Sequence, residues 1–172
     1  MIAPRIETER LILRGYARAD FPSYVRNWAD PRVVRFIGGR PFTAEESWHR
    51  FLRNVALWEM LDYGYWAVEE KASGAFVGEA GFADFKRDMA PSIEGKPEMG
   101  WVFAPEVHGR GYATEATQAA LRWADAAWGA RPIVCIIDSD HAVSLRLAAK
   151  LDFVRVEDAT YKGAAITLLQ RG

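Results

Sequence analysis

The chain has 172 residues, half of them hydrophobic, including seven tryptophans, six tyrosines and nine phenylalanines. A chain of this length buries roughly two-thirds of its unfolded surface, which excludes a disordered protein and removes the need for a disulfide or a metal to hold the fold. The 22 basic and 23 acidic side chains leave a net charge of −1 with no basic block, which argues against a dedicated nucleic-acid-binding protein.

Cys135 is the only cysteine and lies in the apolar run 133–137, so an intrachain disulfide and a cysteine-based zinc site are excluded. We expect a buried, inert thiol, and no metal site is predicted. No apolar stretch approaches the roughly 20 residues that cross a bilayer, and the N-terminus lacks the basic-then-apolar order of a signal peptide. The sequence therefore predicts a cytoplasmic protein without a membrane partner.

The first predicted elements are a strand over residues 10–14 and a helix that starts at Asp20 and ends near Asp30. Asp20 is expected to cap the free N–H groups of that helix, and Pro22 is tolerated in a first turn. No repeat or Pro/Ser-rich linker interrupts the chain, so one domain spanning residues 1–172 is the simplest organisation.

A second helix is predicted after residue 43, where Thr43 and Glu46 have the spacing of a capping box. Its apolar residues recur at the period of one helix face. They are Trp48, Phe51, Leu52, Val55 and Trp58. This stripe is interpreted as core, with a substrate groove as the alternative.

The next segments favour strands. Residues 65–69 and 76–82 are separated by a polar turn and predict two antiparallel strands. Residues 86–97 are polar and rich in structure breakers, which is typical of a longer, mobile loop. A further strand is predicted over 98–103, and Pro105 stops it.

The C-terminal part alternates helices and strands. A helix is expected over residues 112–128, where small side chains permit close packing on a sheet. The remaining elements are a buried strand over 133–137, a helix over 142–151, and strands over 153–157 and 164–170. The whole pattern predicts a mixed α/β (α+β) protein.

The segment between the strand at 98–103 and the helix at 112 contains two glycines, Gly109 and Gly111. Glycine lets the backbone approach a ligand closely, and the free N–H groups at a helix start favour phosphate oxygens. A tight strand-to-helix turn without a ligand is the alternative interpretation. The Walker pattern and the dinucleotide pattern G-x-G-x-x-G are both absent, since no Gly-Lys-Ser/Thr follows and Thr114 stands where the third glycine would be.

This loop and the segment from His141 to Phe153 together resemble the acetyl-coenzyme A signature of the GNAT superfamily of N-acetyltransferases. That signature is Q/R-x-x-G-x-G/A at a helix start, followed by N-x-x-S with a lysine, a glycine and a phenylalanine downstream. The segments 8–14 and 111–116 and the pair Asp30-Pro31 are similar to the branch of ribosomal-protein N-terminal alanine acetyltransferases.

The resemblance implies a GNAT-like, mostly antiparallel, splayed sheet of about six or seven strands flanked by about four helices. It also implies a site for acetyl-coenzyme A (acetyl-CoA), with the pantetheine arm along the strand 98–103 and the diphosphate at the glycine loop. The cofactor-binding residues expected on this basis are Trp101, Val102, Phe103, His108, Gly109, Arg110, Gly111, Tyr112, Ala113, Thr114, His141 and Ser144.

Four positions depart from the family pattern. His108 replaces Gln or Arg, His141 replaces Asn, and Asp152 replaces Gly. Ala148 stands where many GNAT enzymes carry the tyrosine that protonates the leaving thiolate. The resemblance to the alanine-acetyltransferase branch, where a serine at the position of Ser144 is the usual substitute, implies Ser144 as the candidate acid. A serine at a helix start that bonds nearby backbone N–H groups is the alternative for Ser144.

The mechanism implied by the resemblance is direct attack of a primary amine on the acetyl carbonyl in a ternary complex. Glu98 is the first candidate for the base that removes a proton from the amine, and Glu79 is the second. For both, a solvated or ion-paired strand carboxylate is the alternative.

The sequence leaves the acceptor open between a protein N-terminus, a small-molecule amine and an amino acid. The competing function is a non-catalytic GNAT-like module that binds acyl-coenzyme A as a sensor, and a nucleotide binder is a third possibility. The branch resemblance also allows a homodimer.

Overall fold

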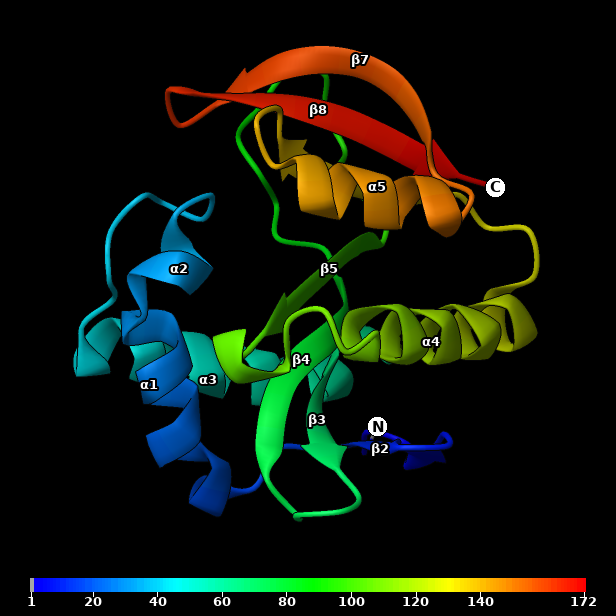
Figure 1. The fold of residues 1–172 in the computed structure, drawn as a ribbon. Coiled ribbons are helices and arrows are strands. Elements are labelled where there is room, and N and C mark those ends of the chain that lie inside the picture. The colour runs from blue at the N-terminus through cyan, green and yellow to red at the C-terminus, as the bar shows by residue number, and fades with distance from the viewer. Residues whose placement is uncertain (1) are drawn as a thin grey trace. The chain divides into compact units, whose positions relative to one another are not determined.

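A computed structural model describes residues 2–172 and confirms the mixed α/β class (Figure 1). Over these residues it contains eight strands and five α-helices. They are β1 (Ile6–Glu7), β2 (Leu11–Arg14), α1 (Phe21–Ala29), α2 (Pro31–Val34), α3 (Ala44–Leu61), β3 (Tyr65–Glu70), β4 (Phe76–Ala83), β5 (Glu98–Phe103), α4 (Tyr112–Trp128), β6 (Ile133–Asp138), α5 (Ala142–Lys150), β7 (Val154–Tyr161) and β8 (Ala164–Arg171). The short β1 and α2 are the two elements that the sequence does not predict.

The chain divides into two compact units, which are described separately. The first contains residues up to 81 together with 101–120, and the second contains 82–100 and 121–172. The expectation of one domain over 1–172 stays a prediction.

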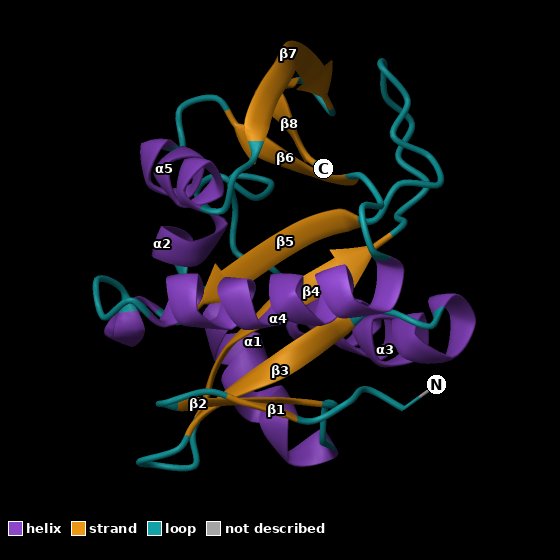
Figure 2. Cartoon of the chain, turned by 90° about the vertical axis from the view of Figure 1, so that its right-hand side faces the viewer, coloured by secondary structure: helices purple, strands orange, loops and turns teal. Residues whose placement is uncertain are grey.

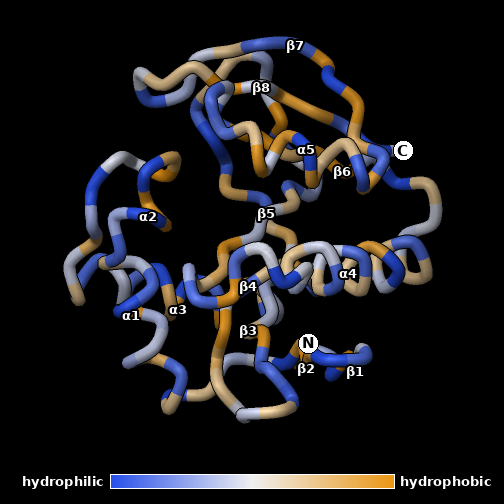
Figure 3. Tube along the Cα trace, viewed as in Figure 1, coloured by the Kyte–Doolittle hydropathy of each residue, from blue (hydrophilic) through white to orange (hydrophobic). Residues whose placement is uncertain are grey.

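In the first unit, strands β1 to β4 pair in chain order, and every pairing is antiparallel. Helices α1 and α3 pack against each other beside these strands (Figure 2). Figure 3 shows the hydrophobic stretch of β3 in orange. The core between the helices and the sheet is strongly aromatic, as the composition suggests. Its buried residues include Tyr24, Trp28, Val33, Val34, Phe51 and Val102.

The apolar stripe predicted for α3 is only partly core. Phe51 and Trp58 are buried, but Trp48, Leu52 and Val55 are 36%, 45% and 46% exposed. The inward face of the helix instead includes two polar residues, Ser47 and Asn54, both fully buried. Asn54 occupies an inward position because its amide hydrogen-bonds buried groups of the first unit.

The side-chain caps predicted for two helix starts can be compared with the hydrogen bonds in the structure. The capping box of α3 is confirmed, because Thr43 Oγ1 accepts from the Glu46 N–H and Glu46 accepts from the Thr43 N–H. The cap expected from Asp20 is wrong, since its side chain makes no cap hydrogen bond to α1. The Asp20 carboxylate instead accepts hydrogen bonds from the Arg14 guanidinium and from the Ala17 N–H, because a short 3₁₀ turn precedes the helix.

In the second unit, β6 pairs with β8 and β8 pairs with β7, both antiparallel. Strand β5 joins β6 in parallel where Glu98 lies beside Val134. Strand β7 has only one neighbour in this unit, and most of its residues are exposed. Residues 84–97 form no helix or strand, which agrees with the loop predicted over residues 86–97. Ile93 packs from this loop onto Val134 and Leu168.

Candidate functional site

The glycine loop precedes α4 in the first unit. Gly109 and Gly111 have φ values of +77° and +80°, a region that side chains with a Cβ rarely adopt. A Cβ built on Gly109 would meet nothing within 4 Å, so open space adjoins the backbone there. The first N–H groups of α4, beginning at Tyr112, have no acceptor inside the helix, and the helix dipole adds partial positive charge. The loop therefore offers a binding place for a phosphate group.

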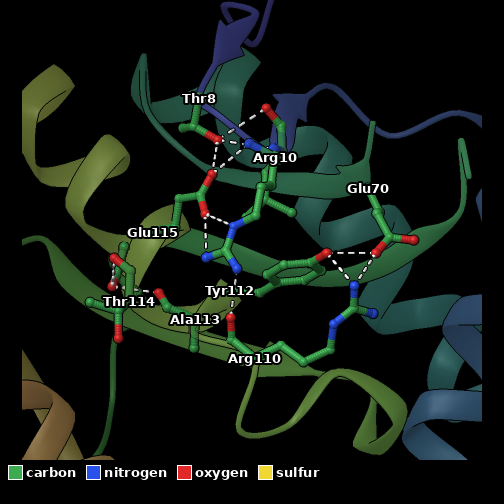
Figure 4. A network of polar contacts seen from close by, with 10 residues as sticks. Thr8, Arg10, Glu70, Arg110, Tyr112, Ala113, Thr114 and Glu115 are labelled. Atoms are coloured by element: carbon green, nitrogen blue, oxygen red, sulfur yellow. Dashed lines mark hydrogen bonds and ion pairs between the residues drawn. The ribbon is translucent and has the colours of Figure 1, made fainter. Parts of the chain in front are cut away.

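A clasp formed by Thr8, Arg10 and Glu115 holds this loop against the N-terminal segment (Figure 4). The Glu115 carboxylate accepts from Thr8 Oγ1 at 2.6 Å, from the Arg10 N–H at 2.8 Å and from Arg10 Nε at 2.7 Å. Arg10 Nη1 also donates to the carbonyl oxygen of Arg110 at 2.8 Å. Burial raises the pKa of Glu115, but the hydrogen bonds from Thr8 and Arg10 outweigh it, so the pKa lies below its usual value.

The Arg110 side chain is engaged with a glutamate that sequence reasoning missed. Arg110 Nη2 lies 2.8 Å from Glu70 Oε1 and 2.6 Å from Tyr112 Oη, and Tyr112 Oη donates to the same Glu70 oxygen (Figure 4). A hydrogen bond with Ser73 contributes most to lowering the pKa of Glu70, and those with Tyr112 and Arg110 add to it. Since Glu70 balances its charge, we infer that the loop relies on backbone N–H groups for much of its attraction to phosphate. The sequence of Tyr65–Glu70, whose only charged residues are the two glutamates at its end, gave no signal for this contact.

The other cofactor residues predicted in the first unit lie close to the loop in sequence. His108 Nε2 lies 2.9 Å from the carbonyl oxygen of Phe103, so its ring is held against the end of β5. Val102 and Phe103 are buried, while Trp101 is half-buried. Ala113 and Thr114 form the first turn of α4.

Glu98, the first candidate for the base, belongs to the second unit and is 4% exposed. Its two carboxylate oxygens accept from Nε and Nη2 of Arg87, at 2.5 and 2.6 Å. The guanidinium carbon of Arg87 lies over the rings of Phe85 and Tyr161, 4.9 and 4.8 Å from their centroids. The bidentate ion pair gives Glu98 a fixed orientation. Nothing in the sequence pattern pointed to Arg87.

His141 and Ser144 come together at the start of α5. Ser144 Oγ lies 3.4 Å from His141 Nε2, and Ser144 is 9% exposed. The serine thus pairs with the imidazole within the described residues 2–172. Ala148 is fully buried one turn further along the helix. Asp152, at the usual glycine, has φ of +63°, which explains why a glycine suits that position.

Cys135 is buried on β6, as predicted. Burial in an apolar strand raises the pKa of the Cys135 thiol, and the nearby Glu98 charge raises it further. Among residues 2–172, no group of three or more His, Cys, Asp or Glu side chains is placed to hold a metal ion. None of the helices in the same range has the length and apolar character required to span a membrane.

Comparison with known proteins identifies the family. The model of the acetyltransferase (GNAT) domain family matches residues 10–154. This chain belongs to the GNAT acetyltransferases.

Relatives of known structure and sequence agree with that assignment. A putative GNAT-family acetyltransferase from Bordetella pertussis is 32% identical, with a TM-score of 0.86 over 98% of this chain and 99% of that one. The uncharacterized N-acetyltransferase YoaA of Bacillus subtilis is 24% identical over 87% of this chain and 82% of its own length. A ribosomal L7/L12 alpha-N-protein acetyltransferase, solved in complex with coenzyme A, shares the fold with a TM-score of 0.75 at 15% identity, over 98% and 97% of the two chains.

The GNAT fold supports acetyl transfer from acetyl-CoA, and this chain is an N-acetyltransferase by family. The loop around Gly109 and Gly111 is compatible with the diphosphate of that cosubstrate, because both glycines have positive φ values and open space adjoins the backbone at Gly109. The clasp explains in physical terms why two distant motif segments, 8–14 and 111–116, occur together in one sequence.

Proposed function

We propose that this GNAT enzyme transfers the acetyl group of acetyl-CoA to a primary amine by direct attack, without a covalent enzyme intermediate. The glycine loop at the start of α4 is the observation that carries the proposal, since its geometry suits a diphosphate. Cys135 is a poor nucleophile because it is buried and its thiol pKa is raised.

The loop residues His108 to Thr114 would hold the diphosphate, with His141 and Ser144 as further cofactor contacts. Backbone groups of Trp101, Val102 and Phe103 would align the pantetheine arm, and N–H groups near Val102 and Phe103 would stabilise the developing oxyanion. The bound cosubstrate supplies an acetyl thioester.

Glu98 is proposed as the base and Ser144 as the acid. A protonated amine must lose a proton before it attacks, and a buried carboxylate with a fixed orientation suits that role. Arg87 would have to release one Glu98 oxygen, or a water molecule would relay the proton. Ser144 has His141 within 3.4 Å to support a proton transfer to the thiolate.

The acceptor is proposed to be a protein N-terminus or a small-molecule amine. The likeness to a ribosomal-protein acetyltransferase favours the N-terminus only through the shared fold. No nucleic acid or membrane partner is part of the proposal, and a homodimer is compatible with it.

The test begins with calorimetric titration of acetyl-CoA into the protein, followed by thiol release against a panel of amines. The proposed reaction requires both binding and amine-dependent release. Glu98→Gln should lower kcat by about 10²- to 10⁴-fold and change the pH–rate profile. The matched control is Glu94→Gln, which alters an exposed glutamate of the neighbouring loop and should leave the profile unchanged.

Three outcomes would contradict the proposal or a part of it. Binding of acetyl-CoA without turnover on any amine would favour the sensor module, for which the altered residues His108, His141, Ala148 and Asp152 are the motivation. An unchanged pH–rate profile in Glu98→Gln would remove Glu98 from the mechanism. Stabilisation by NAD or ATP without any by coenzyme A would point to a nucleotide binder.

A further inference from the structure

Arg50 on α3 is a half-buried arginine that donates no hydrogen bond to any residue of 2–172. Its guanidinium carbon stacks 3.8 Å from the centroid of the Trp28 ring and lies 5.9 Å from that of Phe42. The nearest carboxylate belongs to Glu79, with Arg50 Nε and Glu79 Oε1 separated by 4.0 Å. Both of these atoms are buried without a hydrogen-bond partner. Such buried orphan groups are rare in native proteins and call for an explanation.

Glu79 is itself a weak partner for Arg50. It is 1% exposed, and burial raises the pKa of its carboxyl despite the nearby arginines. Its other oxygen, Oε2, accepts from Tyr16 Oη at 2.5 Å and from Asn54 Nδ2 at 3.0 Å. The protein therefore satisfies one Glu79 oxygen fully, while the other oxygen forms only a long ion pair with Arg50, at 4.0 Å and without a hydrogen bond.

A guanidinium that is stacked on a ring and holds only a long ion pair has a specific chemistry. It presents donors in a planar fork that matches a carboxylate in bidentate geometry, and stacking on an aromatic ring fixes its orientation in advance. The Arg50 side chain is 21% exposed, so solvent reaches part of it. Ser47, one turn earlier on the same helix, adds a buried hydroxyl that has no hydrogen-bond partner within residues 2–172.

We propose that Arg50 binds a carboxylate of the acceptor, so that the enzyme acts on amines that also carry a carboxylate group. This inference rests on the proposed function, because it names a class of acceptor for the same reaction. A site for an ammonium group on Glu79 is the competing arrangement, and it would require Arg50 to leave.

The pair of Arg50 and Glu79 makes acceptor binding depend on pH. The groups that face Glu79 are Tyr16, Tyr24, Arg50, Arg53 and Asn54. A carboxylate bound at Arg50 adds negative charge beside Glu79 and favours its protonated form. Acceptor affinity should therefore fall as the pH rises through the Glu79 pKa, and this dependence should disappear in Glu79→Gln.

The experiment compares a series of ω-amino acids, from two to six carbons, with the corresponding ω-amino amides. For each compound, KM is measured by thiol release, and Kd is measured by calorimetry in the presence of coenzyme A. The variants are Arg50→Met, Arg50→Lys and Glu79→Gln. The control is Arg26→Met, which alters an exposed arginine on α1. Circular dichroism melting establishes that each variant is folded.

The wild-type enzyme should prefer at least one acid over its amide by about 10- to 100-fold, the range of a charge-assisted bidentate contact. Arg50→Met should remove that preference, Arg50→Lys should retain part of it, and Arg26→Met should keep it. At high pH, Glu79→Gln should bind the acid more tightly than the wild type does.

Equal affinity of the wild type for every acid and its amide would overturn the inference, whichever variants fold. Loss of acceptor binding in Glu79→Gln together with tighter binding in Arg50→Met would overturn it in favour of the ammonium site. If no amine causes release of the coenzyme A thiol, the proposed function fails. The calorimetric comparison of acids with amides still tests separately whether Arg50 binds a carboxylate.

Discussion

Replacing Glu115 tests whether the clasp holds the glycine loop. In Glu115→Ala, three hydrogen bonds to one carboxylate are lost, and that side chain is only 16% exposed. A hydrogen bond to a charged group contributes about 1.5–3 kcal/mol, but the 42% exposure of the Arg10 side chain reduces its share. Thr8 Oγ1 keeps the Leu11 carbonyl as an alternative acceptor at 3.2 Å. We expect a loss of about 2–3 kcal/mol in the free energy of unfolding.

For a chain of this size the loss lowers Tm by about 5–10 °C, measured by circular dichroism or calorimetry. Glu115→Gln should lose about half as much, because the amide oxygen still accepts hydrogen bonds. KM for acetyl-CoA should rise in both variants, since Arg10 also binds the carbonyl oxygen of Arg110. The control is Glu7→Ala, a half-exposed ion pair with Arg5 and Lys71, which should leave Tm within about 1 °C.

The same contact has a pH signature. The folded-state pKa of Glu115 lies below 4.5, its value in the unfolded chain. Its contribution to stability is therefore complete above pH 4.5 and is lost as the pH falls through the folded-state pKa. The Tm difference between the wild type and Glu115→Gln should shrink over that acidic range. Equal Tm values for the wild type and Glu115→Ala at pH 7 would refute the reasoning.

Three further predictions concern stability and reactivity. Asp152→Gly should raise the free energy of unfolding by about 0.5–1 kcal/mol, because Asp152 has φ of +63°, and an unchanged or lower urea midpoint would contradict this. Gly78→Ala should destabilise the protein by about 3 kcal/mol or more, since its Cβ would lie 2.5 Å from the Val102 carbonyl oxygen. In Gly109→Ala the new Cβ meets no atom, so this variant should lose only about 1 kcal/mol because of the positive φ. The melting temperature of Gly78→Ala should therefore be the lower of the two, and the opposite ranking would contradict this reasoning. Cys135 should react with a thiol reagent only at the rate of unfolding, because it is 1% exposed and its thiol pKa is raised by burial, so rapid labelling of the native protein at pH 8 would refute its placement.

Local signals in the sequence predicted most elements of the fold. The capping box at Thr43 and the glycines before Tyr112 locate helix starts through short-range chemistry, which a sequence displays directly. The α3 stripe was only partly correct, because periodicity does not reveal that Asn54 is needed inside to bond Glu79. Tertiary partners decide which face of an amphipathic helix is buried.

The sequence alone did not predict which residues contact the candidate site residues. The pairing of Glu98 with Arg87 joins a strand to a loop of irregular structure, and no pattern constrains that contact. The link from Arg110 to Glu70 crosses 40 residues of sequence. Glycines and helix starts can be recognised in a sequence and indicate where a phosphate can bind. The charged partners of the site residues, such as Arg87 and Glu70, are brought to them only when the chain folds.

The clasp also bears on the order in which the chain acquires its structure during synthesis. Thr8 leaves the ribosome 107 residues before its partner Glu115. At about 5–20 residues per second, the N-terminal segment waits for roughly 5–20 s before the bond can form. Strand β2 can pair with β3 earlier, but the glycine loop can reach this hydrogen-bonded arrangement only late in folding. A nascent chain stalled before residue 115 should therefore hold β-structure without binding coenzyme A.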